Sequence, residues 1–365
     1  MTPSLLFEVG VSLVLQISLL VAVAAAFDRI CNSALRSNQI WTATFVATLL
    51  LTVGAFGLPH MRWLGLRVEA DASTLGAVLR FQMLAVKLLG LAWLLGFVAH
   101  LLSRLRRCLA LFHFLKVQCG PLTSAQQAAL PGDIFSQAPR GTRWLVSDQR
   151  HGPFCWQLHQ PTIVLPLDVF ELDPETQGHI LRHEYEHLST GHPLQHFLQG
   201  LCSTLFWFHP AVRLAAGRAE LAREYWCDEV AASNREGVAG YLRSLAAAGE
   251  QSVDAPPCTL AMSRHGSAIV RRSRRLAELI KRREWSPAQD SPRGPLIFVC
   301  VLLAAAVISQ VWLPVNLLAS ERDRMSPWPA WTAGVLHDFG VSVRDYEAFD
   351  HRREAQELLN PDDDE

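Results

Sequence analysis

Two histidines and a glutamate lie close together in the stretch HEYEH at residues 183–187, with types and spacing that suit a metal ion. On a helix, residues four apart lie on one face, so His183 and His187 can bind the same ion through their imidazoles. Glu184 can then reach a water beside that ion. The H-E-x-x-H pattern therefore predicts the first half of a catalytic zinc site.

A second acidic segment can complete the ligand set. Glu224 and Asp228 are four residues apart in a stretch with Arg and Glu at helical spacing, so they are expected on one face of a second helix. Glu224 is the predicted third zinc ligand. Asp228 is predicted to accept a hydrogen bond from a ligand imidazole and to fix its tautomer. His192, His196 and His209 are alternative third ligands, and His192 is near enough in sequence to be the main one.

This residue set favours hydrolysis of a peptide bond. Zinc with three protein ligands keeps a position open for water and lowers the pKa of that water to about 7. Glu184 is expected to accept the water proton and to deliver it to the leaving amine. An oxyanion hydrogen bond could come from Tyr225 or Tyr241, and the sequence does not choose between that role and packing. Three other carboxylates are interpreted as surface or salt-bridge groups: Glu186, Glu220 and Glu229.

The elements that position these residues include membrane spans, because half of the 365 residues are hydrophobic and they are concentrated in a few segments. About 20 apolar residues cross a bilayer core. We expect four transmembrane helices, at about 5–27, 41–58, 83–102 and 295–318. The first lacks a preceding Lys or Arg, so it is expected to stay as an anchor and not to be cleaved as a signal peptide.

Basic residues set the expected orientation of these spans. Arginines cluster at 104–107 and at 271–283, on both sides of the middle segment, so this segment is predicted to be cytoplasmic and both termini outside. The predicted domains are an N-terminal membrane region (1–104), a cytoplasmic zinc peptidase domain (105–294), a fourth span (295–318) and a short external tail (319–365). Membrane lipids are expected partners of the basic segments. Direct nucleic-acid binding is not expected, since the basic segments lack interleaved aromatic residues.

Within the middle segment the pattern is α+β. Short β-rich runs at 144–147 and 162–166 predict a small sheet, of which one strand could form an edge beside the active-site cleft. Asp173 and Pro174 predict the start of the helix that carries the zinc motif, up to His187. The apolar run 198–212 is interpreted as a buried or re-entrant helix, and 268–283 as a basic helix on the membrane surface.

Three segments together resemble the M56 family of membrane metallopeptidases, of the BlaR1/MecR1 type. They are the stretch from Gly152 to Pro166, the zinc-motif helix at 180–187, and Phe206-Trp207-Phe208-His209-Pro210 leading to 223–229. The resemblance implies a mainly α, multi-span protein of the bacterial inner membrane with a cytoplasmic gluzincin-like domain. It also implies His183, His187 and Glu224 as zinc ligands and Glu184 as the catalytic carboxylate.

The resemblance further implies signal transduction by regulated proteolysis. Family members cleave themselves after an outside signal, and a BlaI/MecI-like transcriptional repressor is then inactivated. Two departures stand out. This chain has His192 where the family often has Asp, and the penicillin-binding sensor domain of some members is missing. A β-lactam ligand is therefore not supported, and the sequence does not identify the external signal.

Two alternatives remain open at this point. One is a non-catalytic membrane receptor or scaffold with a structural zinc site, although Glu184 would then have no role. The other is a housekeeping membrane protease of the M48 type, which shares the H-E-x-x-H pattern followed by a later Glu and Asp. The Phe-Trp-Phe-His-Pro segment and Cys227-Asp228 favour the M56 type.

Overall fold

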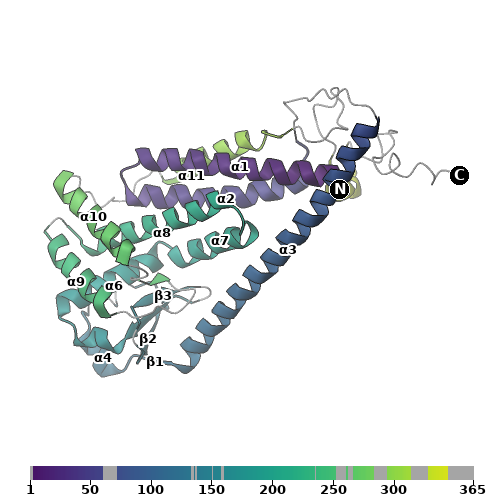
Figure 1. Cartoon of the computed structure of the whole chain (residues 1–365). Helices are drawn as coiled ribbons and strands as arrows, with labels where there is room; N and C mark the ends of the chain where they lie inside the picture. The colour runs from purple at the N-terminus through teal and green to yellow at the C-terminus, as the bar shows by residue number, and fades with distance from the viewer. Residues whose placement is uncertain are drawn as a thin grey trace.

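Long helices and a small sheet make up the computed structural model of the chain (Figure 1). The structure describes residues 3–60, 72–132, 135, 138–149, 151–157, 160–234, 236–251, 260–261, 266–282, 294–313 and 328–343. Helices dominate these residues, as expected from the sequence.

Three helices are long and apolar enough to cross a membrane: α1 (Pro3–Ile30), α2 (Ala34–Gly57) and α3 (Ala72–Val117). α1 and α3 contain the first and third predicted spans, and α2 covers the second as far as Gly57. α3 continues without a break well past residue 102, as its alternating basic and apolar residues predict. The fourth predicted span, 295–318, overlaps α11 (Gly294–Ile308), a shorter apolar helix. Residues 314–318 of the predicted span lie outside the described part of the chain.

α1, α2 and α11 lie side by side and share one apolar core, whereas α3 runs obliquely away from them toward the sheet (Figure 1). Ile17 and Trp41 are completely buried in this core. The same cluster takes in Cys202 and Ala219 from the helices of the middle segment. The middle segment is therefore packed directly onto the membrane helices.

The sheet has five strands in the order β1-β2-β4-β3-β5. Both predicted strands are confirmed, as β2 (Arg143–Ser147) and β4 (Thr162–Pro166), and they pair in parallel with Leu145 opposite Val164. β3 (Phe154–Trp156) runs antiparallel to β4, and the two-residue β5 (Leu260–Ala261) pairs antiparallel with β3. β1 (Cys119–Pro121) follows α3 almost at once. β1, β3 and β5 are too short to show a period in the sequence.

The helix predicted for the zinc motif is confirmed as α6 (Pro174–Ser189). Asp173 caps it, accepting a hydrogen bond from the Thr176 amide at 3.0 Å, and Pro174 fits the first turn, where no amide donor is needed. The basic helix is α10 (Gly266–Arg282). The remaining elements are η1 (Leu167–Glu171), α4 (Ser124–Ala129), α9 (Val238–Gln251) and α12 (Ala330–Asp338).

The sequence suggested one buried helix for the apolar run 198–212, and this prediction is wrong. The run contains the end of one helix, a turn and the start of the next, which together form a helical hairpin. α7 (His192–Leu205) ends before Phe206, and α8 (Pro210–Ala231) begins at Pro210, which cannot continue the preceding helix. The turn reaches the middle of α1 and α3: His209 Nε2 lies 3.1 Å from the Val14 carbonyl, and Trp207 Nε1 donates to the Trp93 carbonyl at 3.3 Å. A side chain at Gly96 would collide with the Trp207 ring.

Candidate metal centre

Two packed helices bring the predicted ligands together. α6 carries His183 and His187, and α8 crosses it with Glu224. His183 Nε2 and His187 Nε2 are 3.2 Å apart. Glu224 Oε2 lies 3.6 Å from His183 Nε2, and Glu224 Oε1 lies 3.6 Å from His187 Nε2. These three side chains form a group that could hold a metal ion.

The arrangement fits zinc on its own geometry. Bonds of about 2.0–2.1 Å to a tetrahedral ion place ligand atoms about 3.3 Å apart, close to the observed separations. Two unprotonated ring nitrogens facing one another at 3.2 Å repel unless a cation or a proton lies between them. The donor set of two imidazoles and one carboxylate is that of catalytic zinc, with a position left for water.

Glu184 is fully buried, and neither of its carboxylate oxygens has a hydrogen-bond partner among the described residues. Burial raises its pKa to about 8. An unpaired buried carboxylate is costly, so its presence beside the ligands indicates a functional role. A water or a substrate group at the ion would give it the partner that it lacks.

The far side of the His183 ring faces charged groups. Its Nδ1 lies 3.3 Å from Asp228 Oδ1 and 3.1 Å from the Tyr241 hydroxyl, which itself donates to Asp228 at 2.6 Å. Burial opposes a charged His183, but the hydrogen bonds to Asp228 and Glu224 outweigh it and raise the pKa to about 9. The structure thus places Asp228 beside His183, as the sequence predicted, and the Tyr241 hydroxyl contacts the same ring.

Arg272 of α10 completes this charged group, and sequence reasoning missed it. Its Nε donates to Asp228 Oδ2 at 2.8 Å, and its Nη1 lies 3.0 Å from Glu224 Oε2. Burial would raise the pKa of Glu224, but the Arg272 charge lowers it overall. A signal was present: Arg272 is on the same helical face as the buried Leu276 and Leu279, an unusual position for an arginine.

The far side of the His187 ring faces neutral groups. Its Nδ1 lies 2.9 Å from His192 Nδ1, and His192 Nε2 lies 3.2 Å from the Asn38 side-chain nitrogen on α2. Cys227 Sγ lies 3.6 Å from His192 Nδ1. Burial lowers the pKa of His187 to about 3 and that of His192 well below its usual value.

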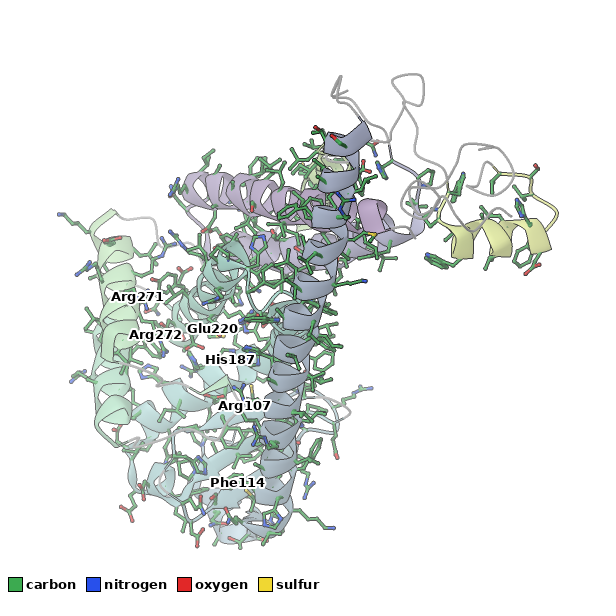
Figure 2. The ribbon with its side chains drawn as sticks, turned by 45° about the vertical axis from the view of Figure 1, so that its right-hand side comes forward. Arg107, Phe114, His187, Glu220, Arg271 and Arg272 are labelled. Carbon is green, nitrogen blue, oxygen red and sulfur yellow. The ribbon has the colours of Figure 1, made fainter. Side chains whose placement is uncertain are left out.

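His192 does not join His183 in a ligand set, although the sequence allowed it as the third ligand. It forms a second possible metal group with His187 and Cys227, and that group uses the other nitrogen of His187. The group containing Glu224 is the one beside Glu184 and has the open position that catalysis needs. Figure 2 shows His187 inside the molecule, between the helices that carry Arg272 and Arg107.

The other candidate residues have structural partners. Glu186 accepts hydrogen bonds from Trp226 at 2.5 Å and from Ser189 at 3.1 Å, and Glu229 pairs with Arg275 at 3.4 Å. Tyr225 lies under the Arg275 guanidinium. None of these residues belongs to a group with metal-binding geometry among the described residues.

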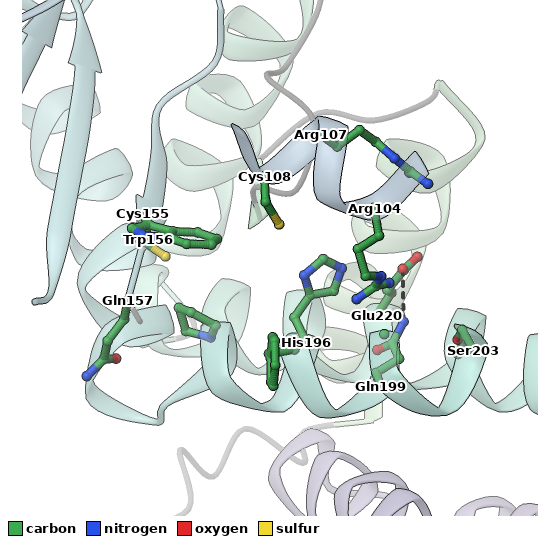
Figure 3. Close-up of a pocket in the computed structure, with 14 residues that line it drawn as sticks. Arg104, Arg107, Cys108, Cys155, Trp156, Gln157, His196, Gln199, Ser203 and Glu220 are labelled. Atoms are coloured by element: carbon green, nitrogen blue, oxygen red, sulfur yellow. Dashed lines mark hydrogen bonds between the residues drawn. The ribbon is translucent and has the colours of Figure 1, made fainter. Parts of the chain in front are cut away.

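A cavity of about 230 Å³ lies beside the site, between α3, α7 and β3 (Figure 3). Arg104 and Arg107 of α3 line one wall, and His196 and Gln199 of α7 line another. Cys155 of β3 also lines it and is close enough to Glu184 and Glu224 that, after burial itself, their charges raise its pKa. The cavity therefore shares Cys155 with the surroundings of Glu184 and Glu224.

A helix with two histidines and a glutamate, completed by a carboxylate from a second helix, defines a metallopeptidase-type site. Comparison with known families agrees. The family described as BlaR1 peptidase M56 matches residues 66–275, more than half of the chain. The chain belongs to this family, whose members are membrane-associated metallopeptidases in signalling. No curated protein matches the chain.

Proposed function

We propose that this protein is a zinc metalloendopeptidase of the bacterial inner membrane that acts in signal transduction by regulated proteolysis. His183, His187 and Glu224 hold the ion, and Glu184 is the catalytic base. The observation that carries the proposal is the convergence of three ligand atoms next to a buried carboxylate with no hydrogen-bond partner among the described residues.

Each side chain of the proposed site has its own role in hydrolysis. Zinc supplies Lewis acidity and an acidified water when bound. Glu184 accepts the proton of that water and returns it to the leaving amine, and its raised pKa suits both steps near neutral pH. Asp228 and Tyr241 hold the His183 ring in place, and Arg272 holds one oxygen of Glu224.

Self-cleavage has support in the sheet. Leu260 and Ala261 pair antiparallel with β3, opposite Cys155 and Phe154. An antiparallel strand added to a sheet edge is a common way of binding an extended peptide. Leu260 and Ala261 therefore lie beside β3, which packs against α6, the helix that carries Glu184, and this contact favours the region as a substrate.

The remaining parts of the proposal concern setting and partners. The proposed topology has four spans, with α11 as part of the fourth, a gluzincin-like peptidase domain in the cytoplasm and both termini outside. The basic clusters that flank the middle segment support this orientation. The proposed substrates are the protein itself and a BlaI/MecI-like repressor, and the external signal is a ligand or partner that the chain does not identify.

The test measures zinc content and self-cleavage of the full chain in membranes. Wild type and Glu184→Gln are expected to hold about one zinc, Glu224→Ala to lose it, and cleavage to fall by roughly 10²–10⁴-fold in Glu184→Gln. Glu186→Gln is the matched control, since Glu186 lies on the same helix but bonds Trp226 and Ser189. It should keep both zinc and cleavage.

The receptor or scaffold alternative gives a different result. If Glu184→Gln is cut as fast as wild type while zinc stays bound, Glu184 is not the base and the zinc is structural. If Glu224→Ala keeps its zinc, the third ligand lies elsewhere. Family membership favours the M56 type over the M48 alternative.

A further inference from the structure

The neutral contacts behind His187 form a chain that leaves the peptidase domain. They run from His187 on α6 to His192 at the start of α7, and from His192 to Asn38 on α2. All three side chains are buried, with Asn38 only 3% exposed. α2 is one of the helices long enough to span a membrane. A membrane helix thus reaches a predicted zinc ligand through one intervening side chain.

The directions of these hydrogen bonds follow from the chemistry of imidazole. If Nε2 of His187 binds the ion, its ring proton must sit on Nδ1. His187 then donates to His192 Nδ1, 2.9 Å away. A neutral His192 that accepts at Nδ1 carries its own proton on Nε2. The nearby Cys227 thiol, a weak donor, is compatible with an accepting Nδ1.

The Nε2 proton of His192 points at Asn38 and needs an acceptor there. The Asn38 nitrogen lies 3.2 Å from His192 Nε2, and its Oδ1 is buried with no hydrogen-bond partner among the described residues. Half a turn of the amide exchanges these two atoms and puts the oxygen opposite the N–H. Asparagine can meet this requirement, whereas an aliphatic side chain cannot.

We propose that Asn38 is a positioning residue for the metal ligand His187 and acts on it through His192. The proposal rests on the proposed zinc site. Asn38 fixes the tautomer of His192, and His192 fixes the ring orientation of His187. Thr42, one turn along α2, accompanies it by donating to Gln195 of α7 at 3.1 Å. A shift of α2 relative to α7 therefore changes how firmly the ion is held.

The test compares metal binding by variants of the full chain in detergent. Zinc affinity is measured by competition with a chromophoric chelator, and ligand geometry by the absorption spectrum of bound Co²⁺. Asn38→Leu is expected to weaken zinc binding by about 10–100-fold, the usual effect of losing an outer partner of a ligand histidine, and to alter the Co²⁺ spectrum. Asn38→Asp keeps an acceptor and should retain the affinity and spectrum of wild type.

Thr48→Val is the matched control, because Thr48 is buried on the same helix and its hydroxyl bonds only the Thr44 carbonyl of its own helix in the structure. It should leave both readouts unchanged. In a background of His192→Phe, Asn38→Leu should add no further loss, since Asn38 acts through His192. Should Asn38→Leu fail to fold, Asn38→Ala, which adds no bulk, replaces it.

Three results overturn the proposal. They are wild-type affinity and spectrum in Asn38→Leu, a loss in Asn38→Asp as large as in Asn38→Leu, and additive losses with His192→Phe. Failure of the zinc site itself is distinguishable, because wild type would then bind neither Zn²⁺ nor Co²⁺. That outcome removes both proposals together.

Discussion

The two histidines of the metal centre are one helical turn apart, yet they are supported in opposite ways. Behind His183 lies a charged group, Asp228 with Arg272 and the Tyr241 hydroxyl, which comes entirely from the middle segment. Behind His187 lies an uncharged pair, His192 and Asn38, which ends in the membrane bundle. The pKa of His183 is raised to about 9, and that of His187 is lowered to about 3.

The two supports affect different properties of the site. At the proposed zinc site, the charged support is expected to control the protonation of His183 and so the strength of metal binding. The neutral support adds no buried charge and connects the candidate site to α2, one of the helices long enough to span a membrane. Breaking each support should therefore give a different signature.

Removing the positive charge of Arg272 from the charged support should have the largest effect. Arg272→Gln leaves the buried Asp228 and the partly exposed Glu224 without their common partner. Loss of one side of a buried ion pair destabilises by about 3–5 kcal/mol. Thermal unfolding of the purified chain should show the loss as a lower melting temperature. Arg271→Gln, at the exposed neighbouring position, should change the melting temperature little. Equal melting temperatures for both variants would contradict the charged network.

The pH dependence of metal binding should show the second largest effect. With a folded pKa of about 9, His183 is protonated below that pH and must release its proton when the ion binds. Zinc affinity should therefore rise at least about tenfold per pH unit between pH 6 and 8. Asp228→Asn removes the main group that raises this pKa, so the slope should flatten above pH 7. An unchanged slope in Asp228→Asn would exclude Asp228 as the cause.

The smallest expected effect is that of a single hydroxyl. Tyr241→Phe removes the hydrogen bond to Asp228, the contact to His183 and a long hydrogen bond from Arg272, and it leaves the Arg272–Asp228 pair in place. A net loss of about 0.5–1.5 kcal/mol corresponds to a roughly 2–10-fold weaker zinc affinity. Titration against a chelator measures it, with Tyr225→Phe as the control on α8. A loss beyond a hundredfold would mean that Tyr241 contributes more than support.

Much of the site could be predicted because helical spacing is strict. Within each pair, His183 with His187 and Glu224 with Asp228, the residues share a face because they are four apart on a helix. The packing of α6 on α8 then brings the two pairs together. The confirmed cap at Asp173 and Pro174 follows from equally local chemistry. These signals need no knowledge of the tertiary fold.

Asn38, Tyr241 and Arg272 could not be predicted in the same way, because each comes from a different helix and is brought to the site by packing. The apolar run 198–212 was misinterpreted for a related reason. Its composition suits a buried helix, but Pro210 and the contacts of Trp207 and His209 with α3 and α1 turn it into a hairpin. Strands of two or three residues leave no period to detect.

The length of α3 determines how far a tilt of this helix moves the sheet. Its 46 residues form one helix, about 70 Å long at 1.5 Å per residue and more than twice the thickness of a bilayer core. β1 begins two residues after it ends, so the rod is joined almost directly to the edge of the sheet. If α3 tilts as a stiff lever about its N-terminal end, a tilt of 5° gives a displacement of about 6 Å at β1.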